Sequence, residues 1–531
     1  STHNIYNHMH YDIAIIGYGP VGAAAASMFG KKGFNIVVVE PKKDIWDIPR
    51  AVHFDGQVQR VFQTMGISSQ VEEIVDTMTG ITFLNHKGNK IVSLDMTNAP
   101  RKNSYHEDVM FDQPKFERIL RNEAEKNENI DFKIGSFVSN LIPNESNNIL
   151  EIIDINTNQK TEISSSYVIG SDGADSFVRK STNIESKDFK EDEDWIVVDY
   201  LVDDKFEINR QRYQVCDYRR PTTLLPITGN HVRWEFKVKP DDIIEDLEKE
   251  ENIRNFMEPH LWRLHPDIDK NSGKLLRASK YTFHAVLAEN FKFNNCFLIG
   301  DAAHQTPPFL GQGLCQGIKD AYNLCWKLSG VIEKKYDKKI LESFSTERKE
   351  INNFMIKASV EQAKIVGSLD KFKAFRRDVF LTLARIFPKL QGVLTFQYKW
   401  QFKNGILDKD LYPNDSNGMI IPHPDLSIKK DNKQFDEYMD DKFSLILFNL
   451  KEEEVDNINK LDSVQFFNGC VHHFDKNHKF MSDGKLLNWT EKNNISAVVL
   501  RPDKHVYGCC DNKDIESKVD KLINKLHNDL I

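Results

Sequence analysis

Two glycine-rich loops contain the residues whose types and spacing suit the binding of a dinucleotide. The first loop follows an apolar run and opens a run of small residues, and its members are Gly17, Gly19, Pro20, Val21 and Gly22. Between a strand and a helix, such glycines permit a tight turn, close approach of the backbone to a pyrophosphate, and close helix packing. Glu40 ends the next apolar run, where an acidic side chain can bind a ribose diol.

The second loop favours FAD over NAD. An apolar run, 296–299, leads into Gly300 and Asp301, which delivers one carboxylate beside small residues. Asp301 can accept hydrogen bonds from the ribityl hydroxyls of a flavin. Further on, a glycine-rich run opens a helix whose first amides can meet the pyrimidine edge of a flavin, which is negatively charged when reduced. The residues concerned are Gly311, Gly313, Leu314 and Cys315.

A third motif, Asp172 followed by Gly173, ends another apolar run. In this order, the three motifs resemble those of the single-component FAD-dependent aromatic hydroxylases. Within that group, the branch of 3-(3-hydroxyphenyl)propionate hydroxylase and phenol hydroxylase is the most similar. The likeness covers essentially the whole chain, and further segments that carry it are 49–51, 112–114, 216–221, 233–236 and 499–503.

The resemblance implies bound FAD, NADH or NADPH as a transient co-substrate, and hydroxylation of a small phenolic aromatic by O2 through a flavin C4a-hydroperoxide. It implies that Arg50 and Gln113 contact the FAD diphosphate and ribityl chain. It also places Asp172 near the pyrophosphate, in a motif involved in both FAD and NAD(P)H binding. For Arg50, an ordinary surface ion pair remains an alternative.

Three residues are candidates for the chemistry. Pro308 resembles the second member of the family's proline pair beside the reactive flavin edge. Asp55 matches an aspartate that serves the substrate hydroxyl in phenol hydroxylase, and a carboxylate there would favour the phenolate. Asp55 is also suited to cap a helix that begins near Gln57. His53 is the alternative acid–base group, although a lone histidine is more often structural.

A β-rich insertion, 195–238, is expected to cover one face of the flavin and to supply the wall of the substrate pocket. The candidates on it are Tyr213, Gln214, Arg233 and Trp234. Because a strand presents only alternate residues to one face, we expect about half of these four candidates not to face the pocket. Arg233 could pair with a substrate carboxylate, or instead form an ion pair with Glu235 on the sheet.

The motif positions predict an α/β protein with a discontinuous Rossmann-like FAD-binding domain, a β-sheet substrate domain and a C-terminal thioredoxin-like domain. The expected FAD-binding segments are 1–80, 101–190 and 285–375, and the substrate domain comprises 81–100 and 191–284. A helical connection, 376–413, precedes the thioredoxin-like domain, 414–531, in which strands are expected at 443–448, 463–467 and 497–501. That domain is implied by the family, and this chain lacks C-x-x-C after its first strand.

Length and composition agree with an ordinary globular enzyme. The chain has 531 residues, 40% of them hydrophobic and 28% charged, with a net charge of -8, so a nucleic-acid partner is not expected. Without a membrane-length apolar run, no membrane partner is expected either, and the predicted location is cytoplasmic. The seven cysteines form no regular framework, so no metal site is expected. A homodimer is predicted.

Other functional classes remain open at this point. A flavin-dependent halogenase shares the first loop, and residues 46–49 imitate half of a halogenase signature. A flavin dehydrogenase of the same fold would incorporate no oxygen. A flavin-binding protein without hydroxylase activity is the third alternative, although the glycine-rich run 311–317 and the proline pair are intact.

Overall fold

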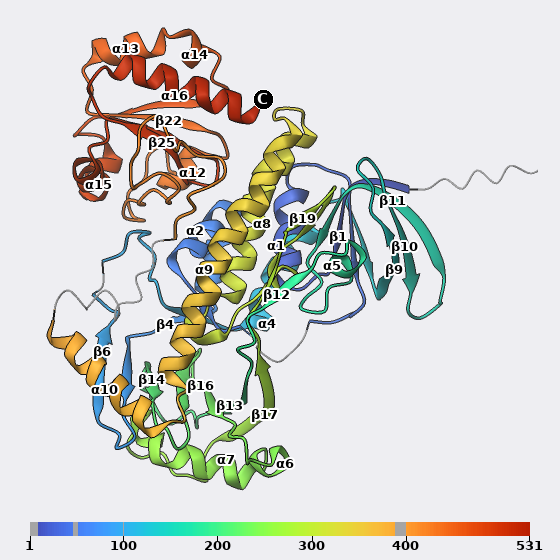
Figure 1. The fold of residues 1–531 in the computed structure, drawn as a ribbon, viewed down its shortest axis with the longest axis vertical. Coiled ribbons are helices and arrows are strands. Elements are labelled where there is room, and N and C mark those ends of the chain that lie inside the picture. The colour runs from blue at the N-terminus through green and yellow to red at the C-terminus, as the bar shows by residue number, and fades with distance from the viewer. Residues whose placement is uncertain (1–8, 46–50, 99, 388–399) are drawn as a thin grey trace, which may run out of the picture.

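The protein is described by a computed structural model that covers residues 9–45, 51–98, 100–387 and 400–531. Its largest sheet has the strand order β19-β20-β11-β1-β2-β8, extended by β10 and β9 (Figure 1). The bounds of these strands are β1 Met9–Ile16, β2 Ile36–Glu40, β8 Ile130–Ile134, β9 Ser136–Ile142, β10 Asn148–Asp154, β11 Lys160–Gly170, β19 Lys292–Phe293 and β20 Cys296–Leu298.

The parallel strands of this sheet bring the three loop motifs to one edge. β1 runs parallel to β2 and β11, and β11 runs parallel to β20. Their carboxyl ends therefore lie together, and they lead into Gly17, Glu40, Ser171 and Gly300. This edge is where open α/β sheets bind their ligands.

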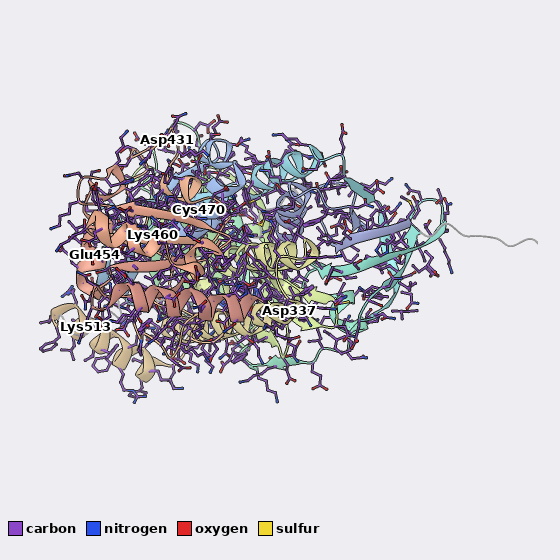
Figure 2. All side chains as sticks on the ribbon, turned by 90° about the horizontal axis from the view of Figure 1, so that it is seen from above. Asp337, Asp431, Glu454, Lys460, Cys470 and Lys513 are labelled. Atoms are coloured by element: carbon purple, nitrogen blue, oxygen red, sulfur yellow. The ribbon has the colours of Figure 1, made fainter. Side chains whose placement is uncertain are left out.

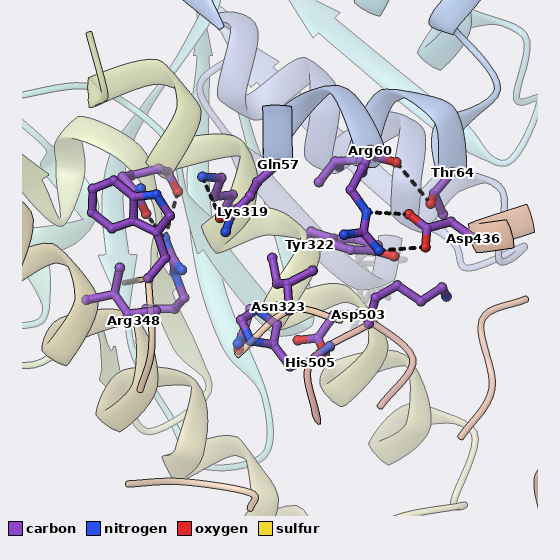
Figure 3. Close-up of a pocket in the computed structure, with 16 residues that line it drawn as sticks. Gln57, Arg60, Thr64, Lys319, Tyr322, Asn323, Arg348, Asp436, Asp503 and His505 are labelled. Carbon is purple, nitrogen blue, oxygen red and sulfur yellow. Dashed lines mark hydrogen bonds and ion pairs between the residues drawn. The ribbon is translucent and has the colours of Figure 1, made fainter. Parts of the chain in front are cut away.

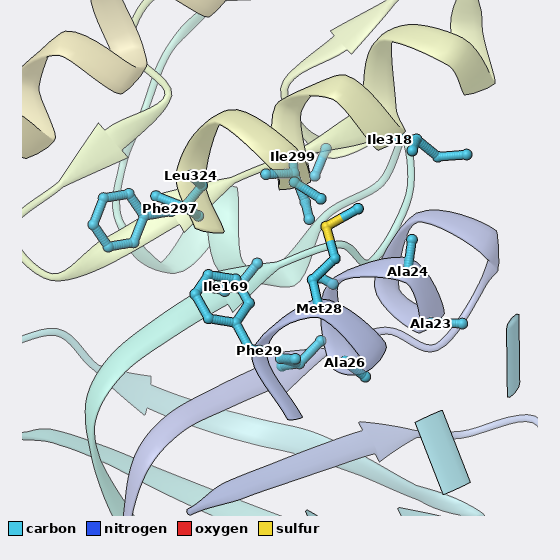
Figure 4. Packing of buried hydrophobic residues seen from close by; sticks show 14 of the residues in the cluster. Ala23, Ala24, Ala26, Met28, Phe29, Ile169, Phe297, Ile299, Ile318 and Leu324 are labelled. Carbon is cyan, nitrogen blue, oxygen red and sulfur yellow. The ribbon is translucent and has the colours of Figure 1, made fainter. Parts of the chain in front are cut away.

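Helices cover the sheet closely because the first helix consists mainly of small residues. α1 (Pro20–Gly30) packs against α4 (Gln113–Glu125) and α8 (Gly313–Ile332), and its four alanines are fully buried. Figure 4 shows Met28 of α1 facing Ile299, next to α8. Small side chains let the helix axes approach closely, and this fixes α8 relative to the β1–α1 turn.

A second sheet has the order β17-β13-β16-β15-β14-β5-β6. Its strands are β5 Gly80–Leu84, β6 Lys90–Asp95, β13 Glu193–Leu201, β14 Gln211–Val215, β15 Thr222–Pro226, β16 His231–Lys237 and β17 Lys274–Phe283. One face packs on α7 (Glu250–Met257), and part of the other packs on α9 (Glu342–Val366) and α10 (Lys371–Ile386). In the register of β16, Glu235 lies opposite Val197 and Thr223.

The C-terminal unit is a sheet of order β23-β22-β24-β25, in which β22 is parallel to β23 and antiparallel to β24. Its elements are β22 Ser444–Phe448, α13 Glu452–Asn459, α14 Asp462–Gln465, β23 Cys470–Phe474, α15 Lys485–Asn493, β24 Ala497–Leu500, β25 Val506–Cys510 and α16 Ile515–Leu530. Figure 2 shows α16 alongside these strands, with Asp337 near its end. Asp337 donates its backbone N–H to the Leu530 carbonyl at 2.8 Å.

One predicted strand of this unit is wrong. Residues 462–465 form α14, and the second strand lies at Cys470–Phe474. The helix begins at Asp462, whose carboxylate in the first turn suits the positive end of the helix dipole. Among the described residues, we find no helix with the length and apolar character needed to cross a membrane, and no group of three or more His, Cys, Asp or Glu side chains arranged to hold a metal ion.

Candidate functional site

A cavity of about 640 Å³ lies between the carboxyl edge of the first sheet and one face of the second. The predicted site residues that line it are Gly17, Gly19, Pro20, Val21, Glu40, His53, Gln113, Asp172, Arg233, Asp301, Pro308, Gly311, Gly313 and Leu314. The predicted residues that lie within the described ranges but outside the lining are Gly22, Asp55, Tyr213, Gln214, Trp234 and Cys315. Arg50 lies outside the described residues.

The first glycine loop leaves backbone open to the cavity. A Cβ at Gly17, where φ is +103°, would lie 2.3 Å from the carbonyl oxygen of Ser171. A Cβ at Gly22 would lie 2.0 Å from the carbonyl oxygen of Gly17, so Gly22 serves packing behind the loop. At Gly19, a Cβ would meet nothing within 4 Å. Backbone amides can therefore approach a diphosphate here.

Glu40 and Gln113 are both held in place by backbone groups. Glu40 accepts from the backbone N–H of Tyr18 and of Lys42, each at 3.1 Å. Gln113 accepts from the backbone N–H of Ala51 at 2.7 Å. Glu40 thus stands at the end of β2 in the position expected for a ribose ligand.

Buried Asp320 on α8 fixes the loop that carries Asp301. Its carboxylate accepts from the Gly300 N–H at 3.0 Å, from His304 Nε2 at 2.5 Å and from Arg348 Nε at 2.6 Å. Burial would raise the pKa of Asp320, but the charges of His304 and Arg348 lower it below its ordinary value. Sequence reasoning missed Asp320 because its role depends on contacts between separate elements.

The start of α8 faces the cavity through its glycines. Gly313 lines the cavity, and a Cβ there would meet nothing within 4 Å. Cys315 lies behind this surface, where its thiol donates to the His53 carbonyl at 3.5 Å and burial raises its pKa. Its side chain therefore does not reach the cavity, which limits the predicted role of Cys315 to its backbone.

Asp172 lines the cavity, but the start of the next helix also engages its carboxylate. Oδ2 accepts from the N–H groups of Phe177 at 2.8 Å and Val178 at 3.2 Å, and Oδ1 accepts from the Ser176 hydroxyl. Burial raises the pKa of Asp172. The carboxylate therefore holds α5 (Phe177–Ser181) against the loop and presents Gly173 to the cavity.

Asp55 has the position of a helix cap. It accepts from the Val58 N–H at 2.7 Å at the start of α2 (Gly56–Met65), and its other oxygen lies 2.7 Å from Lys319 Nζ. Burial would raise the pKa of Asp55, but Lys319 lowers it below its ordinary value. Asp55 is outside the cavity lining, so its geometry fits the cap that the sequence left open and not the predicted contact with a phenol.

Both ring nitrogens of His53 face acceptors. Nε2 lies 2.8 Å from Asp108, and Nδ1 lies 3.0 Å from the Gly311 carbonyl oxygen. Burial would lower the pKa of His53, but the hydrogen bond and charge of Asp108 raise it well above its ordinary value. A ring protonated at both nitrogens satisfies both acceptors. His53 therefore links Gly311 to Asp108, and its acid–base role stays a prediction.

The second sheet divides the four predicted wall residues between its faces. Tyr213 and Trp234 lie in the core that packs on α7, on the side away from the cavity, so their positions do not fit the predicted contact with substrate. Gln214 is fully buried and shares a hydrogen bond with Thr223 at 2.7 Å. Arg233 lines the cavity, and its guanidinium lies 3.3 Å from Asp199 rather than pairing with Glu235.

Two residues of this wall, Arg212 and Glu235, were missed by the sequence reasoning. Arg212 donates to the Phe309 carbonyl at 3.2 Å and, in the amide orientation that satisfies both partners, to Gln214 at 2.7 Å. Among the described residues, it has no carboxylate within 4 Å. Because Arg233 faces the cavity, strand alternation would have placed Glu235 there too.

Glu235 is a buried carboxyl group that faces the cavity. Only 8% of the residue is exposed, and its carboxylate makes no hydrogen bond within the described part of the chain. Burial raises the pKa of Glu235, and the opposing charges of Arg233 and Arg212 only partly offset that effect. A raised carboxyl pKa in a cleft is typical of a general acid or base.

A second cavity, of about 40 Å³, lies between α2, α8, α9 and the C-terminal unit (Figure 3). There, Arg60 forms a double hydrogen bond with Asp436, at 2.7 and 2.8 Å. Lys319 donates to Gln57 at 3.0 Å. The volume suits one or two waters, so we assign this cavity to the contact between units.

The larger cavity fits FAD. It offers open glycine backbone at one end, carboxylates at the ends of β2 and β20, and the N-terminus of α8 near the second sheet. This donor set suits a dinucleotide, and the N-terminus of α8 is the group that would hold its flavin end. The fold and the cavity together define an FAD-dependent oxidoreductase.

Comparison with known proteins narrows this class. Residues 10–359 match the family described as FAD binding domain, and residues 418–525 match the HcaD C-terminal domain. The first match spans more than half of the chain, so the chain belongs to that family.

Relatives indicate the activity, and a solved structure shares the fold. A 3-(3-hydroxy-phenyl)propionate/3-hydroxycinnamic acid hydroxylase of Burkholderia cenocepacia (strain HI2424) is 31% identical over 78% of this chain and 74% of that protein. A protein named as a probable NADH-specific resorcinol 4-hydroxylase of Rhodococcus jostii (strain RHA1) is 25% identical over 94% of this chain and 91% of that one. The flavin-dependent monooxygenase PieE, solved with FAD and substrate, has a similar fold, with a TM-score of 0.78, 18% identity, and coverage of 98% and 99%. This chain is an FAD-dependent aromatic monooxygenase that uses NAD(P)H and O2.

Proposed function

We propose that this enzyme hydroxylates a phenol that carries a carboxylate, and that Arg212 and Glu235 recognise the two ends of that substrate. The observation that supports this most directly is a half-buried guanidinium and a buried carboxyl group on one face of the second sheet, both lining the cavity. The hydroxyphenylpropionate hydroxylase relative acts, by its name, on such an acid. Balanced over one turnover, phenol, NAD(P)H, a proton and O2 give the dihydroxy product, NAD(P)+ and water.

Glu235 is proposed to accept the phenolic proton. Bound FAD, once reduced, supplies the activation of O2, and the ring is attacked more readily as a phenolate than as a phenol. A carboxyl group whose pKa is raised toward neutrality is matched to that proton transfer. Pro308 and Phe309 line the same cavity and keep water from the ring.

Arg212 is proposed to bind the substrate carboxylate. Its guanidinium, held by the Phe309 carbonyl, is half-buried and forms no ion pair within the described residues. A planar guanidinium binds a carboxylate through two parallel hydrogen bonds. Arg233 is less suited to that role, because Asp199 already neutralises it.

The remaining expectations are part of the same proposal. The strand order of the C-terminal unit, with one parallel and two antiparallel pairs, supports a thioredoxin-like domain at 414–531 without C-x-x-C. The two larger sheets support the FAD-binding segments 1–80, 101–190 and 285–375, and the substrate-domain segments 81–100 and 191–284. The homodimer and the cytoplasmic location remain predictions.

The test compares NAD(P)H oxidation and product formation with 3-(3-hydroxyphenyl)propionate and with resorcinol. Arg212→Gln should raise KM for the acid by about 10- to 100-fold, the cost of one charged hydrogen-bonded pair, and leave KM for resorcinol unchanged. Arg219→Gln, which removes a nearby exposed guanidinium, is the matched control. Equal loss for both substrates, or a wild-type preference for resorcinol, would overturn the carboxylate assignment.

A further inference from the structure

Helix α10 exposes a continuous apolar stripe. The stripe is formed by Phe372, Phe375, Val379, Phe380, Leu383 and Ile386, whose exposed fractions are 80, 66, 43, 45, 44 and 61%. Spacings of three or four residues place these side chains along one side of the helix. In Figure 1, α10 lies at the edge of the molecule beside β6. Exposed apolar side chains are normal when scattered, but a contiguous row indicates a binding surface.

Cations lie beside and within the stripe. Lys371, Lys373, Arg376 and Arg385 are exposed, and none of them forms an ion pair with the described residues. The helix also contains Arg377 and only one acidic residue, Asp378, although the whole chain has a net charge of -8. This helix is therefore positively charged, although the net charge of the whole protein is negative.

The opposite side of α10 attaches it to the rest of the molecule. Ala374, Leu381 and Ala384 are buried, with at most 4% exposed, and they pack with the second sheet and α9. Arg377 donates to the carbonyl oxygens of Ile365 at 2.9 Å and Cys216 at 2.7 Å. The position of the helix is thus fixed from within, and its outer stripe is not needed to hold it there.

The charges distinguish between two possible partners. If the partner were the α10 of a second copy related by a twofold axis, the four exposed cations of each helix would approach those of the other and repel them. An anionic lipid surface instead complements the cations, while the phenylalanines enter the boundary between headgroups and acyl chains. Surface binding of this kind needs no membrane-spanning segment.

We propose that α10 is a docking helix for an anionic phospholipid surface. The stripe would lie in the interfacial plane with its cations among the headgroups, and the rest of the protein would stay in water. This inference goes beyond the hydroxylase activity. None of the stripe residues lines the substrate cavity, so docking and catalysis can be tested separately.

The experiment is cosedimentation of the FAD-loaded enzyme with two kinds of vesicle, phosphatidylcholine alone and equal parts phosphatidylcholine and phosphatidylglycerol. Binding is expected only to the anionic vesicles, and it should weaken as salt is raised. Lys371→Gln, Lys373→Gln and Arg376→Gln combined should weaken partitioning about 100-fold, at about fivefold for each cation. Phe372→Ser with Phe375→Ser should also abolish the sedimentation.

Phe466→Ser is the matched control, since Phe466 is 82% exposed on the C-terminal unit and should bind vesicles like the wild type. Hydroxylation without vesicles should be unchanged in all variants, which shows that they fold. No binding of the wild type to anionic vesicles would overturn the proposal. Continued binding of the Phe372→Ser, Phe375→Ser enzyme to anionic vesicles would overturn it as well. A change from dimer to monomer in light scattering as the sole effect of that double substitution would also overturn it, because the stripe would then be a contact between copies.

Discussion

Replacing Glu235 with Gln is the sharpest test of the proposed chemistry. Gln keeps the size and the hydrogen-bonding atoms of the side chain but cannot accept a proton at neutral pH. The side chain is 8% exposed and makes no hydrogen bond to the described residues, so the substitution should leave the fold intact. FAD content and nicotinamide-driven flavin reduction should also survive, because neither depends on this carboxyl group.

The later oxygen transfer should slow strongly in Glu235→Gln. Loss of one general base costs roughly 10²- to 10⁴-fold in its step. The oxidising equivalents should then appear as hydrogen peroxide instead of hydroxylated product. The assay is the ratio of product to NAD(P)H consumed, with peroxide measured in the same sample.

The pH dependence supplies a second readout. The pKa of Glu235 is raised by burial, so its basic form is lost as pH falls through that raised value. Coupling in the wild type should therefore fall with decreasing pH, and Glu235→Gln should be poorly coupled at every pH. Glu250→Gln, a change on the exposed surface, serves as the control. A Glu235→Gln enzyme with wild-type coupling and an unchanged pH profile would refute the assignment.

Three further outcomes are expected. Asp301→Ala should fold but purify largely colourless, and flavin absorbance at full stoichiometry would contradict its cofactor role. Asp55→Asn should keep the helix cap and stay coupled, but should lower Tm because Lys319 loses its charged partner. High peroxide release would restore the catalytic interpretation. Arg501→Met should destabilise folding by about 3–5 kcal/mol, since buried Glu347 loses its guanidinium. In the wild type, burial would raise the pKa of Glu347, but the charges of Arg501 and Lys327 lower it from 4.5 to about 2. The ionised carboxylate therefore stabilises the fold above pH 4.5, and this contribution is lost as pH falls toward 2. Acid unfolding of the wild type measures that loss.

Most of the residues that the sequence by itself predicted for the cofactor site line the larger cavity at the carboxyl edge of the first sheet. Gly17, Gly19 and Gly22 act through backbone geometry within a few residues of one another. Glu40 and Asp301 follow buried strands whose parallel pairing brings their ends together. A strand, turn glycines and a helix in this order have a known local geometry. They therefore indicate a dinucleotide cavity before any tertiary contact is known.

The residues that we propose for catalysis and substrate binding depended on tertiary contacts. The sequence could not tell whether Asp55 meets a phenol or caps a helix, because the answer depends on Lys319, 264 residues away. It also could not tell which face of β14 and β16 meets the cavity. It therefore named Tyr213 and Trp234, which lie outside the cavity lining, and did not name Arg212 and Glu235, which are part of it. Alternation along a strand shows which side chains share a face, but it does not show which face is the core. Here the packing of α7 decides this, because it buries one set of alternate side chains and leaves the other set to line the cavity.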